Sequence, residues 1–209
     1  MAHNLLETYG RYKMLFLMAA RPEYGNHLQK LFTPYFVGVG PVEAAVQTTA
    51  ILAKLEKQNA LPDYVVSLGS AGSSKLEQTQ IYQVSSVSWR DMDASLLGVE
   101  KGVTPFLDLP AVSVLPCLLP DEKTASLSTG GNVVSGKAYD VIDADMVDME
   151  TYAIMRACQH FGVKLIGFRG ISDGKDELRH ANDWRQYLHI VDEKLANVIL
   201  KLKEKLESF

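Results

Sequence analysis

The chain has 209 residues, a formal net charge of -4 at pH 7, and 47% hydrophobic and 22% charged residues. These proportions are close to those of soluble globular proteins, and they argue against a disordered, collagen-like or disulfide-framework chain. Lys and Arg are scattered without a basic block, so we expect no nucleic-acid partner. The length suits one large domain, and we predict a single domain over residues 1–209.

Two observations bear on the compartment. Cys117 and Cys158 belong to no CxxC or Cys/His spacing, which argues against a disulfide scaffold and a zinc site and favours a reducing cytoplasm. Residues 11–20, RYKMLFLMAA, have the basic start and apolar run of a signal peptide, but the run is short and starts late, so we interpret it as a buried strand. No run approaches the ~20 apolar residues that span a bilayer, and we expect no membrane contact.

Short apolar runs of the kind found in buried strands recur along the chain. We predict strands at residues 14–20, 35–39, 64–68, 81–87 and 164–171. Helical periodicity lies at residues 42–57, 149–161 and 191–206. Strands alternating with helices predict a layered α/β domain with a largely parallel sheet. Residues 88–123 lack a clear period, which is typical of a long excursion that packs on a neighbour or closes over a site.

Glycine-containing turns follow several of these runs. Gly131, Gly136 and Lys137 have the GxxxxGK spacing of a phosphate-binding loop, but Ala138 stands where a magnesium-binding hydroxyl is needed. In FVGVGPVEAA, Glu43 occupies the third glycine position of a dinucleotide fingerprint. That turn is either a tight helix start or a backbone contact with a ligand. A P-loop NTPase therefore stays an alternative with an incomplete motif.

The stretch SLGSAGS offers small residues after a predicted strand, where a ligand can approach the backbone. Ser70 adds a hydroxyl, but no GxSxG elbow surrounds it, which argues against a serine hydrolase. A ligand loop and a plain turn both fit this pattern.

Acidic residues stand at both ends of one helix-and-strand unit, DMETYAIMRACQHFGVKLIGFRGISDGKDE. Asp148 and Glu150 stand at the start of a predicted helix, where a cap or a favourable interaction with the helix dipole explains them. Asp173 follows a predicted strand, where a turn residue before a glycine is the simple reading. Because ligands bind at the carboxyl ends of strands in open α/β sheets, we also hypothesise that these carboxylates face one pocket.

Seven motifs in chain order resemble the nucleoside phosphorylase/nucleosidase superfamily and, within it, the 5'-methylthioadenosine/S-adenosylhomocysteine nucleosidases. They are Glu23 in AARPEYG, then GVGPVEAA, PDYVVSLGSAGS, RDMD, STGGNVV, DMETYAI and RGISD. The resemblance runs from the first strand to the last helix. It implies a three-layer α/β fold with a central mixed, largely parallel sheet flanked by helices. It also implies hydrolysis of the N-glycosidic bond of a purine nucleoside, with no metal and no cofactor.

The resemblance assigns a role to each catalytic residue. Asp173 is expected to act as the general acid at N7 of the purine, and Glu23 to hold or deprotonate the attacking water. Glu150 is expected to bind the ribose hydroxyls and stabilise the oxocarbenium-like charge. The substrate-binding residues implied are Ser70, Ala71, Gly72, Val133, Val134, Met149 and Ser172, of which the last orients Asp173.

Departures from the family pattern leave alternatives open. Val66, Ser67 and Leu68 stand where related phosphorylases have a phosphate-binding arginine, which favours water as the nucleophile. Arg21 and Arg90 stay candidates for phosphate ligands, so a phosphate-dependent purine nucleoside phosphorylase is one alternative.

The specificity walls also differ. The nucleosidases usually have SGD followed by an aromatic residue that stacks on the purine, whereas Gly131 and Val133 occupy those positions here. Thr151 and Tyr152 follow the Met-Glu pair in place of a small residue, and we expect them to narrow the sugar end. The base and the 5' substituent are therefore open, and a futalosine-type hydrolase or a non-catalytic nucleoside-binding protein are further alternatives.

The family also forms homodimers or larger oligomers in which a neighbour's loop covers the 5' group of the nucleoside. Residues 96–106 suit that loop by composition, although a lid over the chain's own site would have the same sequence. We expect a homodimer.

Overall fold

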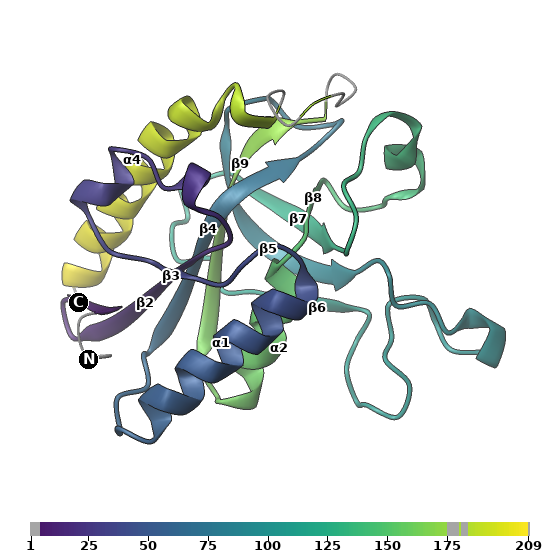
Figure 1. The fold of residues 1–209 in the computed structure, drawn as a ribbon, viewed down its shortest axis with the longest axis horizontal. Coiled ribbons are helices and arrows are strands. Elements are labelled where there is room, and N and C mark those ends of the chain that lie inside the picture. The colour runs from purple at the N-terminus through teal and green to yellow at the C-terminus, as the bar shows by residue number, and fades with distance from the viewer. Residues whose placement is uncertain (1–4, 175–179, 181–183, 209) are drawn as a thin grey trace.

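The computed structural model describes residues 5–174, 180 and 184–208, and its strands belong to one mixed nine-stranded sheet (Figure 1). The strands are β1 (Leu6–Tyr9), β2 (Tyr12–Met18), β3 (Tyr35–Phe36), β4 (Tyr64–Gly72), β5 (Ile81–Trp89), β6 (Val112–Val114), β7 (Thr124–Thr129), β8 (Met146–Asp148) and β9 (Lys164–Asp173). The α-helices are α1 (Pro41–Glu56), α2 (Thr151–His160) and α4 (Leu188–Glu207). Short 3-10 helices are η2 (Arg21–Glu23), η3 (Leu28–Lys30), η4 (Ser95–Leu97) and η5 (Gly136–Val141).

The sheet closes on itself. Its order is β1-β2-β4-β8-β7-β5-β6, and β9 pairs with both β4 and β5, which completes a ring of strands. The pairs β2–β3, β2–β4, β4–β9, β5–β7 and β7–β8 are parallel, whereas β1–β2, β4–β8, β5–β6 and β5–β9 are antiparallel. The expected mixed sheet flanked by helices is therefore confirmed. The closure makes it a barrel rather than a flat, largely parallel middle layer.

The predicted elements agree with the structure where apolar patterning is strong. The three predicted helices and the strands β2, β4, β5 and β9 lie where the sequence placed them, although β4 and β9 extend further, to Gly72 and Asp173. Strand β3 has only two residues. Four strands were missed, namely β1, β6, β7 and β8, because they are short or, as in the stretch TASLST of β7, rich in Ser and Thr.

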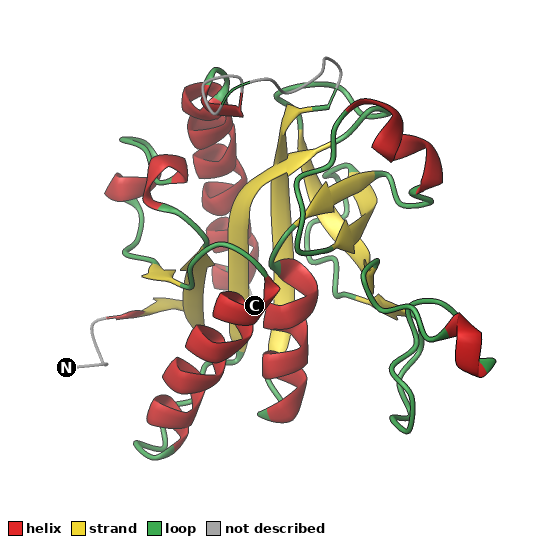
Figure 2. Cartoon of the chain, turned by 45° about the vertical axis from the view of Figure 1, so that its right-hand side comes forward, coloured by secondary structure: helices red, strands yellow, loops and turns green. Residues whose placement is uncertain are grey.

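Helices cover the sheet on two sides and create two hydrophobic cores. Figure 2 shows α1 and α2 side by side on one side and α4 on the other. In the core between these two helices and the sheet, Leu52 of α1 and Ile154 of α2 are almost fully buried. In the core on the opposite side, Leu195 and Leu202 of α4 pack with Phe16 of β2. Burial of such side chains stabilises each layer by about 1.5–3 kcal/mol per residue, so the two cores hold the strand ends that carry the site.

The long segment between β5 and β7 extends away from the body of the sheet (Figure 1). It contains η4 and the edge strand β6, and its side chains Leu96 and Phe106 are fully exposed. In the described residues, no helix is long and apolar enough to cross a membrane. The single-domain organisation of residues 1–209 stays a prediction.

Candidate active site

A cavity of about 490 Å³ lies where β4, β8 and β9 meet the turns after β2 and β7. Its walls combine a few carboxylates with small and apolar side chains, as is usual for pockets that bind small molecules. The lining residues are Ala19, Ala20, Glu23, Val39, Ser70, Ala71, Gly72, Arg90, Asn132, Val133, Val134, Val147, Asp148, Met149, Glu150, Asp173, His180 and Trp184.

The structure brings the predicted site residues together. Glu23, Glu150 and Asp173 all face this cavity, although they lie in three separate parts of the sequence. The predicted binding residues that also line it are Ser70, Ala71, Gly72, Val133, Val134 and Met149. Ser172 does not line the cavity, but it contacts Asp173 from behind. The predicted site residues therefore lie together around one cavity, and their roles stay predictions.

Glu23 ends the 3-10 helix η2 and is only 7% exposed. The backbone N–H and the hydroxyl of Ser70 both donate to Glu23 Oε1, each at 2.7 Å. Glu23 Oε2 is buried and has no hydrogen-bond partner among the described residues. Burial raises the pKa of Glu23, and the two Ser70 bonds oppose that rise. One oxygen is thus held in place and the other is left to bind a ligand or water.

Glu150 occupies the N-cap position of α2, but its side chain does not cap the helix. It accepts a 2.8 Å hydrogen bond from the backbone N–H of Gly40. Gly40 has φ 94°, a conformation that favours glycine. Burial, reinforced by the nearby Asp148 carboxylate, raises the pKa of Glu150 to about 8. The glycine turn therefore contacts a site carboxylate.

Asp173 reaches the cavity because β9 is irregular at its end. Ala71 pairs with Ile171 but Gly72 pairs with Asp173, so Ser172 is an extra residue in β9. Such bulges redirect side chains and are frequent beside active sites. A Cβ atom on Gly72 would lie 2.9 Å from Asp173 Oδ2, so this close approach requires glycine. Burial raises the pKa of Asp173, while the hydrogen bond donated by the Ser172 hydroxyl to Oδ1 lowers it.

A buried ion pair that the sequence did not reveal supports the site from below. Arg169 of β9 contacts Asp148 at 3.1 Å, and both side chains are almost fully buried. The Arg169 guanidinium also donates to the Ser67 and Thr151 hydroxyls, and the Thr151 backbone N–H donates to Asp148. Asp148 is therefore the residue that caps α2. The pattern Arg-x-x-x-Asp in RGISD was visible, but nothing in it showed that Arg169 points inward.

Thr151 and Tyr152 do not narrow the sugar end, contrary to expectation. Thr151 is fully buried and is hydrogen-bonded to Asp148 and Arg169, away from the cavity. Tyr152 stacks on Trp89 with ring centroids 5.6 Å apart. Both side chains extend below the first turn of α2 rather than into the pocket, because the periodicity of a helix separates them from Glu150 by at least 100°.

The P-loop interpretation is wrong. The segment after Gly131 leads into the 3-10 helix η5, not into an α-helix, and Lys137 is exposed and does not line the cavity. The Gly131 N–H donates to the Asp91 carboxylate. A loop whose amide is satisfied by a carboxylate does not offer that group to a phosphate.

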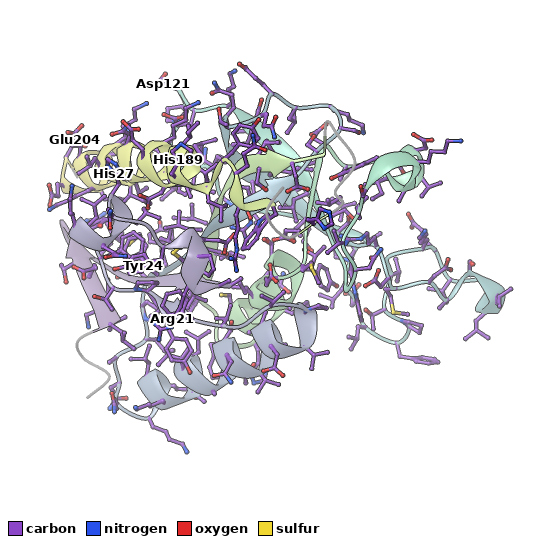
Figure 3. All side chains as sticks on the ribbon, turned by 45° about the horizontal axis from the view of Figure 1, so that its top comes forward. Arg21, Tyr24, His27, Asp121, His189 and Glu204 are labelled. Carbon is purple, nitrogen blue, oxygen red and sulfur yellow. The ribbon has the colours of Figure 1, made fainter. Side chains whose placement is uncertain are left out.

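The two arginines considered for phosphate have other contacts. Arg21, labelled in Figure 3, places its guanidinium 4.9 Å from the centre of the Phe36 ring and does not line the cavity. Arg90 does line it, but its guanidinium donates to the backbone oxygens of Ser128, Asp148 and Asn132 at 2.6–3.0 Å. Arg90 thus holds the wall of the pocket.

The lining residues that the sequence did not single out include three with polar groups, namely Asn132, His180 and Trp184. The Trp184 indole N–H donates to the Ser70 hydroxyl at 2.8 Å. A lone tryptophan shortly before the last amphipathic helix was a signal that could have drawn attention to it. Val133, which stands where the nucleosidases usually have an aromatic residue, lies on the cavity wall and is 66% exposed.

Comparisons with known proteins agree with this arrangement. Residues 124–204 match the family model described as Phosphorylase superfamily. A 5'-methylthioadenosine/S-adenosylhomocysteine nucleosidase of Exiguobacterium sp. is 28% identical, over 81% of this chain and 78% of that protein.

Solved structures show the same fold. A Helicobacter pylori 5'-methylthioadenosine/S-adenosylhomocysteine nucleosidase, an Asp-to-Asn mutant with 5'-methylthioadenosine in its active site, has a TM-score of 0.77 at 18% identity and covers 95% of this chain and 99% of that one. The futalosine hydrolase of Helicobacter pylori has a TM-score of 0.76 at 19% identity, over 94% and 97%. The resemblance to the nucleosidases is therefore confirmed.

Proposed function

We propose that this protein hydrolyses the N-glycosidic bond of a purine nucleoside of the methylthioadenosine or S-adenosylhomocysteine type. The observation that carries the proposal is the meeting of Glu23, Glu150 and Asp173 in one cavity, each with a pKa raised by burial. A raised carboxyl pKa is what general acid–base catalysis near neutral pH requires. The cavity, about 490 Å³, also lies within the ~300–1,000 Å³ range of small-molecule sites.

We assign one part of the reaction to each carboxyl group. Asp173 donates its proton to N7 of the base, and the bond between N9 and C1' of the ribose breaks with its electrons going to the base. Glu150 accepts hydrogen bonds from the ribose hydroxyls and, in its ionised form, stabilises the positive charge that develops on the sugar. Met149, which lies beside it, packs against the ribose.

Glu23 completes the reaction with water. Its unpartnered oxygen, Oε2, is the natural acceptor for a proton of the attacking water. The water oxygen forms the new bond to C1', and the proton passes to Glu23. The products are the free base and the ribose moiety, and no metal or cofactor takes part in any of these steps.

Water suits this site better than phosphate. The residue before Leu68 is Ser67, whose carbonyl and hydroxyl oxygens accept from Arg169, and Arg169 is itself paired with Asp148. Arg90 is similarly engaged with backbone oxygens. A phosphate entering this cavity would meet four carboxyl groups, and both guanidinium groups near it in the described part of the chain are engaged in hydrogen bonds, which supports hydrolysis over phosphorolysis.

The relatives support a nucleoside substrate. The similar curated protein is named a 5'-methylthioadenosine/S-adenosylhomocysteine nucleosidase, and the similar Helicobacter pylori mutant holds 5'-methylthioadenosine. Because a futalosine hydrolase has a similar fold, futalosine is included among the substrates to be tested.

The assay follows base release from methylthioadenosine, S-adenosylhomocysteine, adenosine, inosine and futalosine, with and without phosphate. We expect adenine from one of the first two substrates at a rate independent of phosphate. Ribose 1-phosphate formed only with phosphate would identify a phosphorylase, and fastest turnover of futalosine would identify a futalosine hydrolase. Tight binding of a nucleoside without turnover would identify a binding protein.

The chain is also proposed to act as a homodimer. Leu96 and Phe106 are fully exposed on the protruding segment, and Val42 and Val46 are exposed on α1. Exposed apolar side chains grouped in this way mark protein interfaces. None of residues 96–106 lines the chain's own cavity in the part that the structure describes, which favours a neighbour's site over an intramolecular lid. A single domain and a cytoplasmic location accord with this proposal.

A further inference from the structure

We infer that Trp184 is a positioning residue that fixes the direction of the hydrogen bond between Ser70 and Glu23. The inference rests on the proposed function, because it concerns the residue that activates water. The geometry that carries it is a chain of two bonds: the Trp184 indole N–H donates to Ser70 Oγ at 2.8 Å, and Ser70 Oγ donates to Glu23 Oε1 at 2.7 Å.

The direction of this chain follows from what each group can do. An indole N–H can only donate, whereas a hydroxyl can donate one hydrogen and accept others. Since the Trp184 N–H occupies an acceptor site of Ser70 Oγ and cannot itself accept, the single Ser70 hydrogen is left to be donated to Glu23 Oε1. Without the indole, the Ser70 hydroxyl is freer to rotate and to accept a hydrogen bond from a protonated Glu23. Trp184 thereby favours the ionised Glu23, which is the form that acts as a base.

The hydrogen bonds from Ser70 to Glu23 Oε1 also affect the other oxygen of the carboxylate, Oε2. Glu23 Oε1 receives both bonds from Ser70, whereas Oε2 is buried without a partner among the described residues. Two donors on one oxygen hold the plane of the carboxylate and keep the basic lone pairs of the other oxygen for water. A small loss of orientation at a reacting group has a large effect on rate.

The chain contains a matched control for this residue. Its only other tryptophan, Trp89, stacks on Tyr152, and its indole N–H is buried without a partner in the described structure. Trp89 does not line the cavity. Replacing either tryptophan by phenylalanine removes an indole N–H and keeps an aromatic ring, but only Trp184→Phe removes a bond that leads to Glu23.

A double-mutant cycle tests the inference by turnover. We expect Trp184→Phe to lower kcat by about 5–10-fold, as expected for the loss of one hydrogen bond, with a KM changed less than about 2-fold. In a Ser70→Ala background, Trp184→Phe should cause no further loss. Trp89→Phe should retain wild-type kcat. An equal loss in both backgrounds, or a rise in KM alone, would show that Trp184 serves only as a wall of the pocket.

A spectroscopic measurement tests the same bond without turnover. The two tryptophans give two indole N–H signals in a ¹⁵N-correlated NMR spectrum, and Trp184→Phe identifies one of them. We expect Ser70→Ala and Glu23→Gln to move the Trp184 signal and to leave the Trp89 signal in place. An unmoved Trp184 signal overturns the inference. A wild-type protein without nucleosidase activity that still shows the expected shifts would refute the proposed function and retain the hydrogen-bond chain.

Discussion

The three carboxyl groups to which we assign catalytic roles have different hydrogen-bond partners. Glu23 is bonded through one oxygen to Ser70, Glu150 to the N–H of Gly40, and Asp173 to its neighbour Ser172. Each contact comes from a different element, so each carboxylate keeps its own orientation in a shared space. Different partners in a common low-dielectric site are what separate the roles of acid and base.

Asp173→Asn tests the acid assignment. The amide has the same shape but cannot transfer a proton to the base, so kcat should fall by at least ~100-fold, within the range of general acid catalysis. The dissociation constant of the nucleoside, measured by calorimetry, should change little. Ser172→Ala removes only the hydrogen bond to Asp173 and should therefore cause a smaller fall in kcat. Unchanged turnover in the Asp173 variant would contradict the assignment.

Glu150→Gln tests the cost of burying the sugar-binding carboxylate. Burial and Asp148 raise its pKa from 4.5 to about 8 in the folded state. Its contribution to stability is therefore present below pH 4.5 and is lost as the pH rises through about 8, since the unfolded chain ionises first.

The Glu150→Gln variant has no carboxyl group to ionise, so it does not lose this stability as the pH rises. Relative to the wild type, it should gain about 2–4 kcal/mol in free energy of unfolding between pH 5 and pH 9, while its turnover falls. Urea unfolding at both pH values measures the gain, and Glu193→Gln, on an exposed position of α4, is the control. An equal difference between variant and wild type at both pH values would argue against a raised pKa.

Among the elements, β8, β9 and α2 are joined by the buried pair of Asp148 and Arg169. The pair satisfies the first turn of α2 and places Glu150 at its start. A buried ion pair is costly to break because the remaining charge stays desolvated. The buried pair thus holds the cavity wall, of which Asp148 is itself a part.

Arg169→Leu should therefore lower the free energy of unfolding by about 3–5 kcal/mol, since it leaves the Asp148 carboxylate buried without its partner. Chemical denaturation measures the loss. Lys203→Ala, which removes the half-exposed pair of Lys203 with Glu207 at 3.9 Å, should cost less than about 1 kcal/mol. Similar losses in the two variants would mean that the buried pair contributes no more than a surface one.

The elements also show where sequence reasoning succeeds. Continuous apolar runs identified β2, β4, β5 and β9, and the period of 3.6 identified α1, α2 and α4, because burial dictates both patterns. Strands β7 and β8 went unseen because pairing with neighbours, not apolar patterning, makes them strands. The closure of the sheet depends on β9 pairing with both β4 and β5, a non-local choice that no local pattern records.

For the site, the order of motifs led to residues that the fold brings together. The residues missed, Arg169 and Trp184, act through long-range contacts to Asp148 and Ser70. The role expected for Thr151 was wrong because its direction depends on where α2 begins, and helix boundaries are the least certain feature of a sequence.

At the scale of the whole molecule, the segment between β5 and β7 stands away from the barrel and exposes its apolar tip (Figure 1). In the proposed homodimer, the second copy buries this tip. We expect light scattering after gel filtration to give roughly twice the chain mass of 23.1 kDa.

Replacing both Leu96 and Phe106 by Ser should shift the protein toward monomer, because these fully exposed side chains lose their apolar contact with the second copy. Val141→Ser, at an exposed position of η5, should leave the mass unchanged. A wild-type protein that elutes as a monomer would refute the proposed assembly.

Hydrolysis at this site is tested most directly by following the oxygen atom of the attacking water. With methylthioadenosine in phosphate-free, ¹⁸O-enriched water, the wild type should release adenine and place one ¹⁸O atom on the ribose product, and Glu23→Gln should slow this step at least ~100-fold. No adenine released, or equal rates in the wild type and Glu23→Gln, would contradict hydrolysis at this site.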